Sequence, residues 1–202
     1  EILNPIEETV NESGDLIITS YQNVPLAEIN GFEIEYEQVF EAIMDSPNDL
    51  LVKFNYTETE SEVIVNPGDT YINNIGTVVD AQSLLANGRD TRLQGQSDTI
   101  ANFQIGLDNL QNQTQATLIV NYVSDRVRAR GIDVLPDIIE EPPLLVDFAF
   151  SKIYSYPEFE LKLSLELRNL LDEEYYASMR NIAIYDQYDL GTSASLGFKI
   201  SF

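Results

Sequence analysis

The chain of 202 residues has no cysteine, no histidine and no tryptophan, and it has few basic residues. Without cysteine it can form neither a disulfide framework nor a thiolate metal site. Without histidine it lacks the commonest general base and zinc ligand, which excludes histidine-based hydrolytic triads and zinc catalysis. Its 34 acidic and 11 basic side chains give a net charge of −23, which repels nucleic-acid phosphates and argues against polynucleotide binding.

Long apolar runs are also missing. The sequence contains no stretch of about 18 apolar residues, so it predicts no transmembrane helix. No segment carries a sustained apolar stripe of period 3.6, so we expect almost no helix of any kind. Neither a signal peptide nor an initiator methionine is present, and we therefore expect Glu1 to begin a processed chain or a fragment.

The chain does contain strict alternation of apolar and polar residues. At the carboxy-terminus Ala194, Leu196, Phe198, Ile200 and Phe202 alternate with small or polar residues. Similar alternation recurs in the segments 32–36, 50–56, 101–107, 116–122, 144–150 and 159–167. Successive side chains of a strand point to opposite faces, so each segment predicts a strand with one apolar and one polar face. The sequence predicts an all-β protein.

The spacing of these segments favours an antiparallel transmembrane β-barrel. Short connections near 44–48, 109–114 and 155–157 alternate with long ones at 58–92, 126–142 and 170–190. Outer-membrane barrels alternate in this way between short periplasmic turns and long extracellular loops. A β-sandwich with irregular loops is the alternative. We expect strands at 15–41, 49–60, 97–109, 114–126, 143–155, 158–170 and 190–202, with residues 1–14 in an extracellular loop.

Bacterial single-chain barrels have an even number of strands, whereas about seven are expected here. The remaining strands of a larger barrel must then come from residues or chains outside this sequence. In such a barrel the apolar rows face lipid, and these comprise Phe159, Leu161, Leu163, Leu165, Leu167 and Ile200. The polar rows face the lumen, and these comprise Glu33, Glu35, Glu160, Lys162, Glu166, Arg168 and Lys199.

The charged residues could also serve two other functions. Glu160 or Glu166 beside Lys162 and Arg168 could form an acid–base pair, but no partner nucleophile or metal site accompanies them. We therefore assign no catalytic residue and expect no enzyme. The carboxylates of the long loops could bind Ca²⁺, but they lack EF-hand-like spacing, so we favour simple solvation and expect no metal and no cofactor. The sequence does not identify the ligand-binding residues of the loops 58–92, 126–142 and 170–190.

Several segments, in order along the chain, resemble those of TonB-dependent outer-membrane receptors. They are Tyr21-Gln22-Asn23-Val24 with Ile29 to Glu35, Leu93-Gln94-Gly95-Gln96-Ser97 with Ala101-Asn102, Asn121-Tyr122, Asn169-Leu170-Leu171-Asp172 with Tyr175-Tyr176, and Leu196 to Phe202. The sequence departs from the family pattern at Asp98, where proline is usual, and around Leu190-Gly191-Thr192, where an arginine often follows the glycine. The resemblance covers essentially the whole chain.

The resemblance implies that residues 1–202 form the last third of a barrel of about 22 strands in the outer membrane of a Gram-negative cell. An N-terminal plug and the earlier strands, which this sequence does not contain, would complete the receptor. It would take up a scarce ligand such as a ferric chelate, cobalamin or an oligosaccharide. The inner-membrane TonB–ExbB–ExbD machinery would supply energy through the plug.

The carboxy-terminal residues Leu196, Gly197, Phe198 and Phe202 resemble the assembly signal that the BAM insertion machinery reads. This role predicts that deleting Phe202 lowers the amount of folded receptor in the outer membrane without changing its ligand preference. The alternative function is a passive porin-like or structural barrel component without a plug. A soluble carbohydrate-binding sandwich is a third, more distant alternative.

Overall fold

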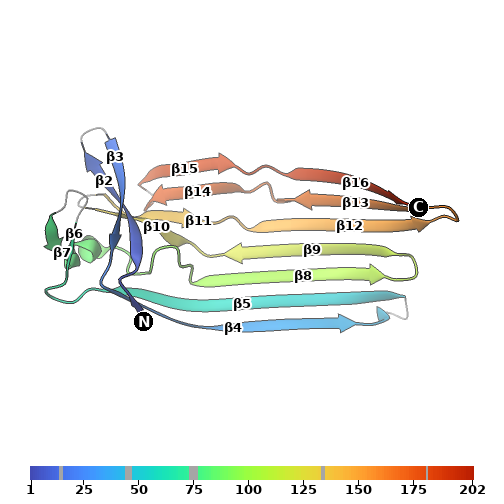
Figure 1. Ribbon diagram of the computed structural model, residues 1–202, viewed down its shortest axis with the longest axis horizontal. Helices are drawn as coiled ribbons and strands as arrows, with labels where there is room; N and C mark the ends of the chain where they lie inside the picture. The colour runs from blue at the N-terminus through green and yellow to red at the C-terminus, as the bar shows by residue number, and fades with distance from the viewer. Residues whose placement is uncertain (14–15, 44–46, 73–76, 133–134, 181) are drawn as a thin grey trace.

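The computed structural model describes residues 1–13, 16–43, 47–72, 77–132, 135–180 and 182–202, and in these ranges it is built of β-strands without any α-helix (Figure 1). A short 3₁₀-helix, η2 (Ala81–Gly88), interrupts them. Most of the expected turn at 44–48, and Asp133 of the expected loop 126–142, lie outside the described residues. The prediction of an all-β chain is confirmed.

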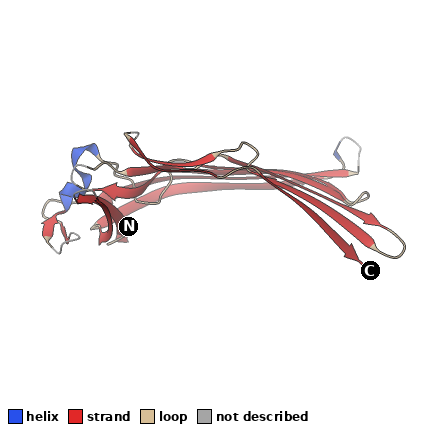
Figure 2. Ribbon diagram, turned by 90° about the horizontal axis from the view of Figure 1, so that it is seen from above, coloured by secondary structure: helices blue, strands red, loops and turns tan. Residues whose placement is uncertain are grey.

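The long strands form one 8-stranded antiparallel sheet in the order β1-β4-β5-β8-β9-β12-β13-β16. Its members are β1 (Ile2–Leu3), β4 (Leu26–Phe40), β5 (Asn48–Ile64), β8 (Thr99–Asn109), β9 (Thr114–Val123), β12 (Leu145–Ser155), β13 (Glu160–Arg168) and β16 (Ser193–Ser201). We call this the large sheet. Seen edge-on it is a single curved layer, and it is not closed, since β1 and β16 stand at its two edges (Figure 2).

A second, 6-stranded sheet has the order β15-β14-β11-β10-β2-β3. Its members are β2 (Ile6–Ser13), β3 (Leu16–Asn23), β10 (Arg126–Gly131), β11 (Ile138–Glu141), β14 (Glu174–Met179) and β15 (Ala183–Asp189). The strands β10, β11, β14 and β15 prolong the strands of the large sheet at one end (Figure 1). The hairpin of β2 and β3 adds to them through a parallel pairing of β2 with β10.

The structure contradicts the expected bounds of the first strand and the expectation that the long connections contain no strands. The expected first strand, 15–41, is divided at Val24-Pro25 into β3 and β4, which belong to different sheets. The expected loops 126–142 and 170–190, and the expected loop 1–14, contain strands of the second sheet. The expected loop 58–92 begins with the end of β5 and continues through the hairpin of β6 (Thr70–Ile72) and β7 (Val78–Asp80) into η2. These strands have only three to eight residues each, so the sequence offers few positions at which a two-residue period can be recognised.

The register of the large sheet puts the apolar residues on one continuous face. Residues that are partners across an antiparallel pair point to the same side. Leu163 pairs with Phe198, and Leu165 pairs with Leu196 and also with Phe150. The same rows continue through β9, β8 and β5 to β4, ending with pairs such as Tyr36 with Phe54. The apolar face therefore runs from β16 to β4.

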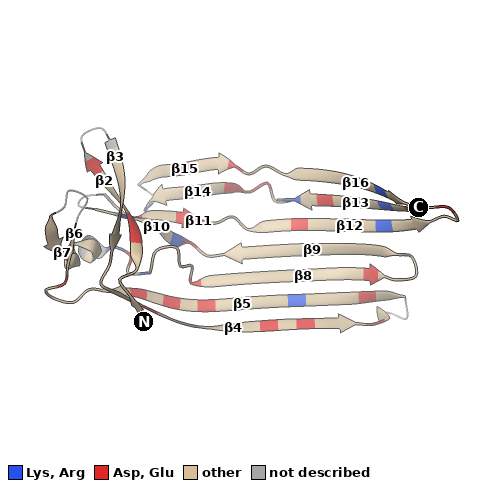
Figure 3. Ribbon diagram, in the orientation of Figure 1, with Lys and Arg blue, Asp and Glu red and all other residues tan. Residues whose placement is uncertain are grey.

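The opposite face of the large sheet is polar. It contains the pair of Ser164 with Gly197 and, farther along the sheet, the pair of Asn102 with Asn55. Figure 3 shows acidic residues in the middle of β4 and, on β5, towards the end that carries η2, with lysines at the far end of β12, β13 and β16. Not all of them belong to the polar face: Lys152 is the partner of Leu163, and Glu58 is the partner of Phe32, so both lie on the side of the apolar rows. Neither face has a second layer of strands across it in the edge-on view (Figure 2).

Two apolar clusters of buried side chains lie at the end of the molecule that carries η2. We call this end the junction, and it comprises β2, β3, β6, β7, η2, β10, β11, β14, the segments that join them and the adjoining ends of β4 and β5. One apolar cluster comprises Val24, Ala27, Val63, Tyr71, Ala81 and Leu84. A second comprises Val10, Ala129, Ile138 and Ala177. Both clusters therefore lie at the junction, where the large sheet contributes only Ala27 and Val63, at the ends of β4 and β5.

The turn Asn169–Asp172 joins the two sheets. Asn169 and Asp172 both have positive φ, of 51° and 55°, which asparagine and aspartate tolerate best among residues with a side chain. The Asn169 side chain accepts a hydrogen bond from Glu173 N at 3.0 Å and donates to Glu173 O at 3.0 Å and Gly191 O at 3.3 Å. Thr192 Oγ1 donates to Asn169 O at 2.8 Å. The motif residues thus fasten β13–β14 to β15–β16.

Candidate functional site

The candidate site lies at the junction, where the segment 89–98 passes from η2 to β8 between β5 and β10. Val63 N of β5 donates to Thr91 O at 2.7 Å, and Gly95 N donates to Val127 O of β10 at 2.8 Å. Gly95 has a φ of 77°, which favours glycine at this turn. The segment is therefore held from both sides and presents its charged side chains in fixed positions.

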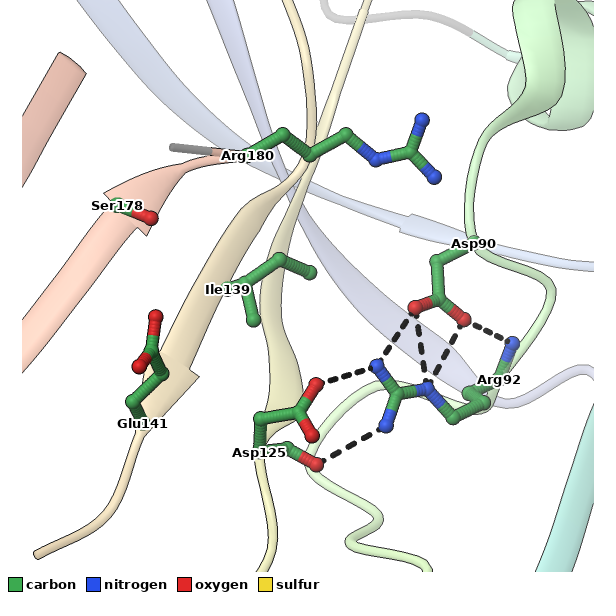
Figure 4. Close-up of a pocket in the computed structure, with 7 residues that line it drawn as sticks. All are labelled: Asp90, Arg92, Asp125, Ile139, Glu141, Ser178 and Arg180. Atoms are coloured by element: carbon green, nitrogen blue, oxygen red, sulfur yellow. Dashed lines mark hydrogen bonds and ion pairs between the residues drawn. The ribbon is translucent and has the colours of Figure 1, made fainter. Parts of the chain in front are cut away.

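Arg92 is the centre of an ionic cluster on this segment (Figure 4). Its Nε donates to both carboxylate oxygens of Asp90 at 3.1 Å, and its Nη2 lies 2.7 Å from Asp90 Oδ2 and 2.9 Å from Asp125 Oδ2. Its Nη1 donates to Asp125 O at 3.0 Å and lies 3.3 Å from Asp98 Oδ2. All three nitrogens of the guanidinium are used, so Arg92 is held rigidly and has no donor left over for a ligand.

The contacts between Asp90 and Arg92 shift the pKa values of both residues. Burial alone raises the pKa of Asp90, but the hydrogen bonds and charge of Arg92 outweigh it, so the pKa of Asp90 lies below its usual value. The hydrogen bond with Asp90 raises the pKa of Arg92. Asp90 therefore stays ionised to a lower pH than an exposed aspartate, and the pair remains charged under physiological conditions.

Two buried ion pairs stand behind this cluster. Arg130 on β10 and Glu7 on β2 are both fully buried and form a two-point ion pair, with Arg130 Nη2 donating to Glu7 Oε1 at 3.0 Å. Arg130 also donates to the backbone carbonyls of Asp90 and Arg92. Arg89 lies 3.5 Å from Asp137, whose second carboxylate oxygen accepts from Asp90 N at 3.1 Å. These pairs tie the N-terminal hairpin, β10 and the segment 89–98 into one unit.

A cavity of about 390 Å³ opens beside Arg92. Its lining residues come from the segment 89–98, β11, β14 and the adjoining turns: Asp90, Arg92, Asp125, Ile139, Glu141, Ser178 and Arg180. In Figure 4 Ile139 stands in the middle, the Arg92 cluster lies on one side of it, Glu141 on the other, and Arg180 extends above it. Neither the guanidinium of Arg180 nor the carboxylate of Glu141 has a hydrogen-bond or ion-pair partner among the residues that the structure describes.

The site residues predicted from sequence lie away from this cavity, on the large sheet. Glu33 and Glu35 stand on β4, whereas Glu160, Lys162, Glu166, Arg168 and Lys199 stand on β13 and β16 at the other side of the sheet. Glu166 and Arg168 form an exposed ion pair of 3.2 Å, and Lys162 is the direct partner of Lys199. The structure thus brings the β13 and β16 residues together on one face and keeps the β4 residues apart from them.

The predicted lipid-facing residues share one face. Leu161 pairs with Ile200 in the same register that pairs Leu163 with Phe198, and Leu165 and Leu167 follow along β13. The rings of Phe159 and Phe202 lie 6.5 Å apart. Of the proposed assembly-signal residues, Leu196, Phe198 and Phe202 are exposed, while Gly197 is close enough to Ser164 that a Cβ there would lie 2.4 Å from its hydroxyl oxygen.

Sequence reasoning missed the junction residues, above all Arg92, Arg130, Glu7 and Asp137. One signal was present: Arg126, Arg128 and Arg130 alternate with the apolar Val127 and Ala129, which has the period of a strand. Arginine is rare in this chain, so a cluster of it indicates a place where the acidic excess is neutralised. The partners of these arginines lie up to 123 residues away in sequence, and no local pattern identifies them.

Two further observations bear on function. Among the described ranges no helix is long and apolar enough to cross a bilayer, and no group of three or more acidic side chains there is arranged to hold a metal ion. Comparison with protein-family models, with curated proteins and with solved structures finds no match.

Proposed function

We propose that this chain forms part of the wall of an outer-membrane β-barrel, with the apolar face of the large sheet against lipid and the polar face towards an aqueous lumen. The observation that carries the proposal is the apolar face itself. Leu196, Phe198 and Ile200 on β16 are 64%, 69% and 55% exposed. An exposed apolar surface that is continuous over several strands is unfavourable in water and favourable in a bilayer.

The dimensions of the strands support this proposal. A transmembrane strand needs about 9–11 residues, and β8 and β12 each have 11. Aromatic residues stand near the ends of the apolar rows, as in the interfacial belts of membrane proteins. They include Phe40 on β4, Tyr122 on β9, and Tyr154 and Tyr156 near the turn after β12, whereas Tyr36 lies nearer the middle of the apolar face.

The open edges of the large sheet support the same proposal. Unpaired backbone groups of an edge strand cannot face hydrocarbon, so further strands must pair with β16 and β4 if the sheet lies in a membrane. We infer that these strands come from residues or chains outside this sequence and close a barrel of about 22 strands. The curvature of the layer is compatible with such a ring (Figure 2).

We further infer that the barrel is that of a TonB-dependent receptor for a scarce ligand. The ordered segments described above support this inference, and the contacts of two of them add to it: Leu93–Ser97 crosses the junction, and Asn169–Asp172 fastens the two sheets. A passive porin-like component remains the second candidate, because the polar face alone would suit either. The partners implied by the first candidate are a plug, the TonB–ExbB–ExbD machinery, the BAM machinery and outer-membrane lipid.

Cysteine labelling tests the orientation of the sheet. This chain has no native cysteine, so single substitutions report one position at a time. We expect Ser164→Cys and Ser151→Cys, on the polar face, to react with a hydrophilic maleimide in the complete barrel reconstituted in lipid vesicles. The neighbours Leu165→Cys and Phe150→Cys should react only with a lipid-soluble maleimide. Equal reaction of both sets with the hydrophilic reagent would rule out the proposed orientation.

Conductance separates the two candidates. A plugged receptor should give no steady potassium chloride current when the complete protein is inserted into a planar bilayer. A porin-like component should give stable, stepwise current. Steady current from the native protein would favour the porin-like candidate and exclude the receptor.

A further inference from the structure

We propose that β3 pairs edge to edge with β3 of a second copy of this chain, antiparallel and with Thr19 on the twofold axis. This pairing joins the second sheets of the two copies into one continuous sheet. The inference goes beyond the proposed function and does not depend on it, since β3 lies at the junction and not on the apolar face of the large sheet.

The outer edge of β3 is free. Among the described residues β3 pairs only with β2, and Val24 N donates to Pro5 O at 2.9 Å just beyond the end of the strand. Because backbone groups alternate in direction along an antiparallel strand, those of Ile17, Thr19 and Tyr21 point away from β2. In the described part of the chain these groups have no backbone partner. Such an edge is a template for a further strand.

The two edge strands of the second sheet differ in how they are protected. The other edge strand, β15, carries Asp186 and Asp189, and a register shift between Ala177 and Ser178 interrupts its pairing with β14. Charges and bulges at an edge hinder pairing with another chain. In contrast, β3 contains no charged residue and no proline, and its pairing with β2 is regular (Figure 3). The edge at β3 is therefore open to a further strand.

The side chains along this edge are self-complementary. Tyr21 and Ile17 are 71% and 54% exposed, and they share one face of β3 with Thr19, which is also exposed. When Thr19 lies opposite Thr19 of the second copy, Tyr21 of each copy lies opposite Ile17 of the other. Aromatic–β-branched and Thr–Thr pairs are among the stabilising cross-strand combinations. A shift by two residues would set Ile17 against Asn23 and leave it without an apolar partner.

The charge of the chain favours a second copy at this edge. Two copies with a net charge of −23 repel each other, and β3 offers a contact without charge. Glu8 and Glu12 on β2 are the partners of Tyr21 and Ile17. In the proposed pairing Glu8 of one copy and Glu12 of the other lie three strand spacings apart, about 14 Å. This exceeds the screening length of about 8 Å at physiological ionic strength. A charged peptide would find no complementary charge on β3.

Cysteine cross-linking of the complete protein in lipid vesicles tests the pairing and its register, because this chain has no native cysteine. Thr19→Cys should cross-link to itself through a short bis-maleimide, since the Cα atoms of opposite residues lie about 5.5 Å apart. Ile17→Cys and Tyr21→Cys should cross-link only when the two variants are co-expressed, because identical positions away from the axis are about 14 Å apart. The control Gln187→Cys, exposed on β15, should not cross-link.

Three outcomes of this experiment would overturn the proposal. The first is that Thr19→Cys reacts with a monofunctional maleimide but gives no cross-linked dimer. The second is that Thr19→Cys does not react at all, which would show that another segment covers the edge. The third is that the cross-linked product contains a different protein instead of a second copy.

A charge substitution tests the strength of the association. Thr19→Lys places two ammonium groups opposite each other on the twofold axis and should raise the Kd of the dimer about fivefold or more. Analytical ultracentrifugation of the complete protein in detergent measures this change, and circular dichroism checks that the variant is folded. The matched control Gln187→Lys makes the same change in charge at β15 and should leave the Kd unchanged. Equal weakening by both variants, or a wild-type protein that is monomeric at every concentration, would contradict pairing through β3.

Discussion

The large sheet and the junction differ in how far their apolar side chains are covered by protein. The largest fully buried side chains among the described residues, including Arg130, Glu7, Leu84 and Ile138, lie at the junction, where apolar clusters and ion pairs are shielded by protein. The large sheet leaves Phe198 and Leu196 exposed and has no second layer of protein over them. The junction therefore covers its apolar side chains with its own residues, whereas the large sheet leaves them uncovered, as the proposed contact with lipid would require.

The largest expected effect is at the junction. Arg130→Met should destabilise the folded protein by about 3–5 kcal/mol, because it leaves the Glu7 carboxylate buried without its partner. Urea unfolding in lipid vesicles measures this change. The double variant Glu7→Leu/Arg130→Met removes both charges and should recover most of the stability. If the double variant is as unstable as the single one, burial of an unpaired charge is not the cause.

The apolar face should give the next largest effect. Leu165→Arg should destabilise the reconstituted barrel by about 2–4 kcal/mol, since it places a charge against the middle of the bilayer. Its neighbour Ser164→Arg carries the same group on the opposite face and should change stability much less. Both are measured by urea titration in the same lipid. Similar losses for the two variants would mean that the two faces do not differ in their surroundings.

The turn between the two sheets should give an intermediate effect. Asn169→Ala removes the side-chain hydrogen bonds to Glu173 and Gly191 and should cost about 1–3 kcal/mol, because Asn169 is buried. Hydrogen exchange should quicken in β14 and β15 more than in β12. The exposed neighbour Leu171→Ala serves as the control. Uniform quickening of exchange over the whole chain would contradict a local role for this turn.

The stability of the junction should depend on acid pH through Asp90. A carboxylate whose pKa is lower in the folded than in the unfolded state contributes stability above the unfolded value, and this contribution is lost as the pH falls through the folded value. The wild-type protein should therefore lose stability below the usual pKa of aspartate. Asp90→Asn should lower stability at neutral pH and flatten this part of the profile. An unchanged profile would show that Asp90 is not the group responsible.

The smallest expected effect concerns Lys162 and Lys199, which are direct partners across β13 and β16. Like charges in this position repel each other, so Lys199→Glu should stabilise the protein by about 0.2–1 kcal/mol. Lys199→Gln, which only removes the charge, should give part of the gain. Both are compared by urea titration at low and high salt, and the gain should shrink as salt screens the charges.

The sequence predicted the features of the structure that arise from residues close together in the chain. The strands of the large sheet, such as 159–167 and 194–202, were predicted because apolar and polar side chains alternate along each of them, and this alternation can be recognised within a single segment of the sequence. The strands β10, β11, β14 and β15 were expected to be loops. They are only four to seven residues long, and although Arg126, Arg128 and Arg130 of β10 keep a two-residue period, their partners, such as Glu140 at 2.8 Å from Arg126, lie on other strands.

The candidate site was not predicted either, because its residues come together only in the folded chain. Arg92, Asp125, Glu141 and Arg180 are far apart in sequence and share no motif. They meet only because β11 and β14 pair with each other and because the segment 89–98 is fixed between β5 and β10. The resemblance to a family segment covers Leu93–Ser97, but it gives no indication of the ionic cluster around Arg92.

The sequence by itself determined that this protein is made of strands and which residues of each strand share a face, because the period of two follows from the geometry of the extended backbone. The tertiary structure alone decided which strands are neighbours, where the hairpin of β2 and β3 attaches, and which charges meet. These depend on hydrogen bonds and ion pairs between distant segments, as between Glu7 and Arg130, whose energy is gained only once the chain is folded.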